Sequence, residues 1–180
     1  IARITSGFSG ADLANLLNEA AILAVRDDRP RITMKDMSEA ATKVMMGPQK
    51  RSKVMTERDR KITAYHESGH AILHKLLPYC DEVQEVSIVP RGMAGGYTMS
   101  RPDSDDNYST INKLNNTIAS MMGGRIAEDL IFHDITTGAS NDIEQATKLA
   151  RKMVTQFGMS EKLGFINLGS TSEVCIGRDY

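Results

Sequence analysis

Residues 56–78 read TERDRKITAYHESGHAILHKLLP and carry a clear helix signal. Thr56, with Asp59 three positions later, predicts a capping box that starts the helix. Apolar residues and histidines then recur at helical spacing on one face, and Pro78 ends the pattern. We therefore expect a single amphipathic helix between Thr56 and Pro78. It carries the residues with the strongest chemical signal in the chain.

This helix contains the pattern HExxH, formed by His66, Glu67 and His70. Residues four apart lie on one face of a helix, so both imidazoles can reach one metal ion. Glu67 directly follows His66 and so points to a neighbouring side of the helix. There it can face a water on that ion and take a proton from the water. The pattern predicts a zinc-dependent endopeptidase, because zinc lowers the pKa of a bound water and polarises the scissile carbonyl. The simpler alternative is a helix that carries both histidines by chance, which is rare in a chain with 4 histidines.

A catalytic zinc site needs a third protein ligand, and the residues alone leave its identity open. The metzincin pattern is excluded, because Leu76 stands where its third histidine would be. Asp142 is the first candidate, since it follows a Gly-Ala-Ser-Asn turn at a predicted helix start, although it could simply complement the helix dipole. Glu128 is the second candidate, with an ordinary solvated position as its alternative. His74 is expected to be a surface or packing residue, and His133 to complement the dipole at a helix end. The other carboxylates considered are Glu85, Asp129 and Asp134.

The chain before the HExxH helix predicts two shorter helices, which begin with capping boxes at Ser9 and Thr33. Two such helices bury little on their own, so residues 1–46 resemble the edge of a larger domain. Residues 47–55 combine glycine, proline and basic side chains, which is typical of a linker. We expect the domain with the metal site to occupy residues 56–180.

The chain after this helix predicts a small β-sheet and more helices, so the fold class is mainly α. Alternating residues at 86–88 and a partner stretch at 95–99 indicate two strands. A helical pattern then starts at Ser109 and contains the pair Gly123 and Gly124, which would kink it or allow close packing. A last helix is expected to start at Asn141.

Composition excludes several classes of protein. The 180 residues are 41% hydrophobic and 25% charged with a net charge of -1, which is a globular balance without a nucleic-acid-binding surface. Apolar runs are far shorter than the roughly 20 residues of a bilayer span. Cys80 and Cys175 lie far apart and fit a reducing compartment. The chain begins at Ile1 and ends without a stop signal, so we expect a piece of a longer protein.

Several motifs, taken together and in order, resemble those of the FtsH family, the membrane-anchored AAA+ zinc proteases. The resemblance extends over essentially all 180 residues. Its motifs are GFSGADL at 7–13, MMGP at 45–48, TAYHESGHA at 63–71, IVPRG at 88–92, GGRIAE at 123–128 and TGASND at 137–142. The first resembles the last helices of an AAA+ lid subdomain, and the second resembles the junction between ATPase and protease.

The resemblance implies a zinc site whose third ligand is Asp142, with Glu128 in a supporting or structural role. It also implies a homohexamer whose ATPase ring unfolds protein substrates, among them membrane proteins and unstable soluble proteins. ATP would bind only through an AAA+ part that this chain lacks, and a segment absent from the chain would anchor the protein in the membrane. A bacterial inner or plasma membrane, with this part facing the cytoplasm, is the expected location. The mitochondrial inner membrane is the alternative.

A non-catalytic oligomerisation or adaptor module with a structural zinc site is the competing hypothesis. Such a site needs a fourth protein ligand, and no cysteine lies near the HExxH pattern to supply one. A structural site also has no use for Glu67. Two smaller expectations concern residues 48–53, predicted as a flexible hinge, and residues 101–108, predicted as a mobile loop near the substrate or an inert surface loop.

Overall fold

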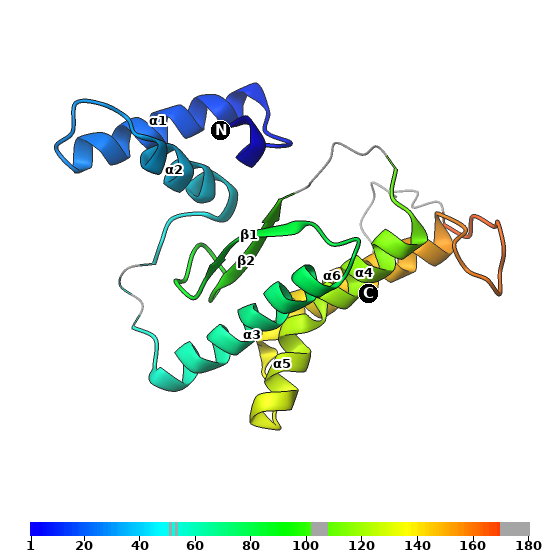
Figure 1. Ribbon diagram of the computed structural model, residues 1–180. Coiled ribbons are helices and arrows are strands. Elements are labelled where there is room, and N and C mark those ends of the chain that lie inside the picture. Colours follow the sequence, from blue (N-terminus) through cyan, green and yellow to red (C-terminus); the bar gives the residue numbers. More distant parts are fainter. Residues whose placement is uncertain (51, 53, 102–107, 170–180) are drawn as a thin grey trace, which may run out of the picture.

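The computed structural model describes residues 1–50, 52, 54–101 and 108–169, and it is mainly helical with one small sheet (Figure 1). Its elements are η1 (Ala2–Ile4), α1 (Gly10–Arg26), α2 (Met34–Met46), α3 (Glu57–Leu76), β1 (Glu82–Ser87), β2 (Tyr97–Arg101), α4 (Ile111–Met121), α5 (Gly123–Phe132), η2 (Thr137–Ala139) and α6 (Ser140–Thr155). The predicted fold class is confirmed. None of the described helices has the length and low charge that crossing a bilayer requires.

Helices α1 and α2 begin at the capping boxes that the sequence predicts. The hydroxyl of Ser9 accepts from the N–H of Asp12 at 3.2 Å, and the Asp12 carboxylate accepts from the N–H of Ser9 at 2.8 Å. Thr33 and Asp36 repeat the arrangement at the start of α2. Each box satisfies two backbone donors that a helix start leaves without partners. Both starts are therefore fixed by contacts three residues apart.

An apolar core holds α1 and α2 together. Its buried members are Leu16, Ala20, Leu23, Ala40 and Ala41. Leu16 is only 1% exposed, and burial of a leucine side chain contributes roughly 2 kcal/mol. The small alanines of both helices let the two backbones approach, so α1 and α2 pack against each other.

Helix α3 spans the predicted stretch, although its start is capped by only half of the expected box. Thr56 Oγ1 accepts from the N–H of Asp59 at 3.0 Å. The return contact from the Asp59 carboxylate is absent among the described contacts. The helix ends at Leu76 with Leu77 as its C-cap, one residue before Pro78.

Helix α5 packs directly against α3, backbone to backbone (Figure 1). A Cβ placed on Gly69 of α3 would lie 2.3 Å from the carbonyl oxygen of Gly123, closer than carbon and oxygen approach. A Cβ on Gly123 would in turn lie 2.7 Å from the carbonyl oxygen of Gly69. The chain also breaks at Met122 between α4 and α5. The glycine pair thus marks both a break and a close packing, the two effects that the sequence left as alternatives.

Strands β1 and β2 form an antiparallel pair in which Ser87 faces Tyr97 and Glu82 faces Arg101. The register shifts between Val83 and Glu85. Both strands occur where the sequence indicates them, but β1 extends earlier and β2 begins later than predicted. The sheet packs on α3, so it lies beside the HExxH residues.

The segment after α2 is attached to the loop between the strands. The N–H of Lys50 donates to the carbonyl of Pro90 at 2.9 Å, and the N–H of Gly92 donates to the carbonyl of Pro48 at 3.2 Å. The first part of the predicted hinge is therefore anchored, whereas residues 51 and 53 lie outside the described residues. Residues 102–107 of the predicted loop also lie outside them. The boundaries at 46/47 and 55/56 remain predictions.

Two predicted helix starts are wrong by a few residues. Thr110 rather than Ser109 caps α4, accepting from the N–H of Lys113 at 3.2 Å. The two neighbouring hydroxyls look alike in the sequence, and only the backbone geometry selects one. Asn141 lies inside α6, because the turn before it is already helical in η2 and Thr136 caps that turn instead.

Candidate metal centre

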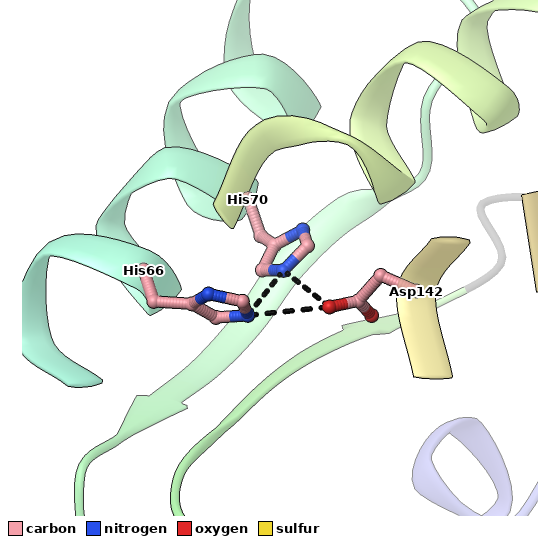
Figure 2. A group of neighbouring side chains, drawn as sticks. All are labelled: His66, His70 and Asp142. Atoms are coloured by element: carbon pink, nitrogen blue, oxygen red, sulfur yellow. Dashed lines mark hydrogen bonds and ion pairs between the residues drawn. The ribbon is translucent and has the colours of Figure 1, made fainter. Parts of the chain in front are cut away.

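Three side chains from two helices point their donor atoms at one spot (Figure 2). His66 and His70 come from α3, and their Nε2 atoms are 3.1 Å apart. Asp142 comes from the first turn of α6, and its Oδ2 lies 3.2 Å from Nε2 of His66 and 3.6 Å from Nε2 of His70. Residues distant in sequence thus form a compact triangle of two nitrogens and one oxygen.

The size of this triangle fits a tetrahedral metal ion. Zinc binds imidazole nitrogen and carboxylate oxygen at about 2.0–2.2 Å, which places neighbouring donors of a tetrahedron roughly 3.3–3.5 Å apart. The three separations of 3.1, 3.2 and 3.6 Å bracket that value. A set of two imidazoles and one carboxylate also leaves a fourth position open, as in catalytic sites.

A buried carboxylate orients the ring of His66 from behind. Nδ1 of His66 lies 2.7 Å from Oε1 of Glu128, and this glutamate is 1% exposed. The other oxygen, Oε2, accepts from the N–H of Thr136 at 2.9 Å. Glu128 therefore faces the nitrogen of His66 that points away from the triangle, which fixes the ring and its tautomer.

A backbone carbonyl plays the same part for His70. Its Nδ1 lies 2.8 Å from the carbonyl oxygen of Ser120, at the end of α4. Since a carbonyl can only accept, Nδ1 carries the proton and Nε2 is left with its lone pair toward the triangle. Both histidines are thus arranged to offer Nε2 to a metal ion.

The three groups also shape one another's titration. Burial would raise the pKa of Asp142, but hydrogen bonds from His66 and His70 outweigh it and hold that pKa well below its usual range. Burial would likewise lower the pKa of each imidazole. Hydrogen bonds to Asp142, together with Glu128 for His66 and the Ser120 carbonyl for His70, outweigh it and raise both pKa values. The Asp142 carboxylate therefore favours positive charge beside it, which without a metal ion is a proton on an imidazole.

Glu67 is buried beside the triangle, with 6% of its surface exposed. Burial raises the pKa of its carboxyl group, against a hydrogen bond from Thr98 and the charges of His66 and His70, which lower it. A carboxylate with a raised pKa is a better proton acceptor near neutral pH than an exposed one.

Gly124 makes room for the ring of His66. A Cβ at this position would lie 2.4 Å from Cε1 of His66. The glycine pair of the sequence therefore has two tasks. Gly123 lets α5 touch α3, and Gly124 leaves space for the histidine that the contact brings close.

Several candidates from the sequence lie elsewhere. His74 Nδ1 lies 2.9 Å from the carbonyl of Asp81, and His133 ends α5 with a positive φ of 51°. Glu85 accepts from the hydroxyl of Tyr97 at 2.7 Å. Sequence reasoning missed Ser120, Thr98 and Thr136, since neither a carbonyl group nor a lone threonine carries a recognisable pattern.

Most of the chain matches the sequence model of one known protein family. The sequence model of peptidase family M41 matches residues 53–180. The chain belongs to peptidase family M41. A second family model, that of the AAA+ lid domain, matches residues 1–39 of this chain. The resemblance inferred from the sequence motifs is thereby confirmed.

Curated bacterial proteins are similar in sequence to this chain over essentially its whole length. ATP-dependent zinc metalloprotease FtsH 1 of Thermoanaerobacter sp. (strain X514) is 54% identical over 99% of the chain, which corresponds to 30% of that protein. ATP-dependent zinc metalloprotease FtsH of Caldicellulosiruptor bescii is 53% identical over 99% of the chain and 29% of its own length. FtsH 2 of Alkaliphilus metalliredigens is 50% identical over 100% of the chain and 26% of its own length. The chain thus spans less than a third of these relatives.

Proposed function

We propose that this chain is the peptidase part of a zinc-dependent endopeptidase, with His66, His70 and Asp142 as metal ligands and Glu67 as general base. The triangle of donor atoms carries the proposal, because its size and composition suit a catalytic zinc site. Membership of a peptidase family and the names of the relatives support it.

The side chains divide the chemistry between them. Bound zinc would supply a Lewis acid that makes a water more acidic and a peptide carbonyl more electrophilic. Glu67 would take the proton of the attacking water and return it to the leaving amine. Glu128 and the carbonyl of Ser120 would hold the two imidazoles in the tautomer that binds metal.

The adaptor hypothesis with a structural zinc site finds less support. A structural site closes its coordination with four protein ligands. Within the described ranges, the cluster that could hold a metal comprises three side chains, His66, His70 and Asp142. A buried glutamate next to them also suits a catalytic site, because a structural one has no use for a base.

For the longer protein we propose an ATP-dependent protease that acts on misfolded membrane proteins and unstable soluble proteins. The match to an AAA+ lid in residues 1–39 and the names of the relatives support an ATP-driven ring, which we propose to be a homohexamer. ATP would be bound by parts of the protein outside this chain. Membrane anchoring by another segment, with this part facing the bacterial cytoplasm, is proposed on the same basis.

Zinc content tests the ligand set directly. Elemental mass spectrometry should find about one zinc per wild-type chain and a clear loss in Asp142→Ala. Asp129→Ala, an exposed aspartate on α5, is the matched control and should keep its zinc. Full zinc in Asp142→Ala would place the third ligand elsewhere.

Glu67→Gln tests the base. It should keep zinc but lower the cleavage of a quenched fluorescent peptide about 100-fold to 10,000-fold, because a general base contributes that much. Such a peptide needs no unfolding by an ATPase. Glu57→Gln, at the exposed start of the same helix, should cleave like the wild type. Unchanged cleavage by Glu67→Gln would refute the proposed mechanism.

A further inference from the structure

Thr98 of β2 contacts Glu67 of α3 in two ways. Its Oγ1 lies 2.9 Å from the carboxylate oxygen Oε2 and 3.0 Å from the backbone carbonyl oxygen of the same residue. Both partners are acceptors, so the hydroxyl of Thr98 is the donor, and its single hydrogen is shared between the two oxygens. Glu67 is 6% exposed, and a buried carboxylate without a hydrogen-bond partner would cost several kcal/mol.

The strand register directs Thr98 toward α3. Its neighbour Tyr97 is 4% exposed, and the Tyr97 hydroxyl donates to Glu85 at 2.7 Å. The guanidinium carbon of Arg91 lies 5.9 Å from the centre of the Tyr97 ring. Because successive side chains of a strand point to opposite faces, anchoring Tyr97 on one face places Thr98 on the other.

Gly96 lies close to the second carboxylate oxygen of Glu67 and has no side chain to push it away. A Cβ at Gly96 would lie 3.0 Å from Oε1 of Glu67 and 2.8 Å from the carbonyl oxygen of Ser87. The start of β2 therefore treats the two oxygens differently. Thr98 binds Oε2, whereas the backbone of Gly96 packs close to Oε1, and a Cβ at Gly96 would also lie 2.5 Å from Cγ2 of Thr63.

We propose that Thr98 is a positioning residue for Glu67, holding the carboxylate through Oε2 in the orientation from which Glu67 takes the proton of a water. This inference deepens the proposed function and rests on it. A glutamate side chain has three rotatable bonds, and a hydrogen bond to Oε2 selects one arrangement of them. Misplacement of a reacting group by roughly 1 Å can lower a rate about 100-fold.

Three variants separate the hydroxyl of Thr98 from its bulk. Thr98→Val replaces the hydroxyl by a methyl group of similar size, Thr98→Ser keeps the hydroxyl, and Thr98→Ala removes both. The matched control is Thr147→Val, since Thr147 is exposed on α6 and its hydroxyl donates to the Ile143 carbonyl.

The expected kinetic result is a loss in kcat and not in KM. Thr98→Val and Thr98→Ala should lower kcat for the fluorescent peptide about 10-fold to 100-fold, with KM within about 2-fold. Thr98→Ser should regain most of the activity. Zinc content should stay near that of the wild type in all three variants. The unfolding temperature should fall in Thr98→Val and Thr98→Ala, where Glu67 loses its hydrogen-bond partner, and should recover in Thr98→Ser. Full activity in Thr98→Val, or no recovery in Thr98→Ser, would overturn the proposal.

A spectroscopic measurement tests the contact without activity. The 13C resonance of the Glu67 carboxyl group, assigned by its loss in Glu67→Gln, should move in Thr98→Val but not in Thr98→Ser or Thr147→Val. An unmoved resonance in Thr98→Val would refute the positioning role. A wild-type chain that binds zinc but cleaves no peptide would instead refute the proposed function, and the carboxyl resonance would then decide on Thr98.

Discussion

The helix pair α1–α2 and the metal-site region bury different kinds of side chain. In the helix pair, the buried core is aliphatic: Leu16, Ala20, Leu23, Ala40 and Ala41. In the region from α3 to α6, the buried set includes Glu67, Glu128, Arg91 and Ser120 beside a few apolar residues. The first region also buries Asp36, which is paired with Arg29 at the start of α2, but most of its buried side chains are apolar. The second region has more charged groups to satisfy out of water, and they lie at the candidate site itself.

The two regions therefore depend to different degrees on two kinds of stabilising contact. Apolar contacts are non-directional and tolerate small shifts, whereas buried charges need partners at defined distances. Glu128, for example, finds two such partners, Nδ1 of His66 and the N–H of Thr136. The metal-site region should therefore respond to changes in geometry, and the helix pair to changes in apolar volume.

The largest effect is expected from Gly69→Ala. Its new methyl group would overlap the carbonyl of Gly123 and push α5 away from α3, at a cost of about 3 kcal/mol or more in the free energy of unfolding. Zinc binding should fall as well, because α5 carries Glu128. Gly95→Ala is the control, since a Cβ there meets nothing within 4 Å. Wild-type stability in Gly69→Ala, measured by urea unfolding, would contradict the close contact.

Leu16→Ala should have the next largest effect and should act on the other region. Loss of this buried side chain should lower the opening free energy of α1 and α2 by about 3 kcal/mol, as seen by hydrogen exchange. Zinc affinity should not change. Leu17→Ala, at a position 52% exposed, should have little effect. A loss of zinc in Leu16→Ala would mean that the two regions are energetically coupled.

Glu128→Gln should weaken zinc binding without unfolding the chain. The amide keeps the shape but removes the charge opposite Nδ1 of His66, and such supporting contacts are worth about 10-fold to 100-fold in metal affinity. Competition with a chelating dye measures the effect. Asp129→Asn, the next residue along and exposed, is the control. Complete loss of zinc in Glu128→Gln would instead suggest that Glu128 is itself a ligand.

The smallest effect is a dependence of the helix pair on acid. Hydrogen bonds from Arg29 and Thr33 hold the pKa of Asp36 well below its usual value. The carboxylate therefore stabilises the fold fully above pH about 4, and this contribution is lost as the pH falls toward and through the lowered pKa. Asp36→Asn should reduce the change in the opening free energy of α1 and α2 between pH 5 and pH 2, as measured by hydrogen exchange. Glu161→Gln should leave that change as it is in the wild type. An unchanged slope in Asp36→Asn would exclude this group.

The sequence alone determined the features that depend on neighbours three or four residues apart. The capping boxes at Ser9 and Thr33 and the shared face of His66 and His70 belong to this class, because such contacts involve only neighbours within one helix. The box predicted at Thr56 forms only its contact with the N–H of Asp59. The errors at Ser109 and Asn141 arose where adjacent residues offered equivalent caps or where the preceding turn was already helical. Local patterns therefore predicted the elements better than their ends.

Only the tertiary structure decided which distant groups meet. It brought Asp142 into the triangle and set Glu128 behind His66, a choice that spacing left open because the two carboxylates lie on other helices. It also buried Arg91, which is 2% exposed and pairs with Glu39 of α2. From the sequence alone, an arginine in a loop would be expected to be exposed. Such contacts depend on how helices pack across tens of residues, and for α3 and α5 the packing depends on Gly69 and Gly123, whose missing side chains let the two backbones touch.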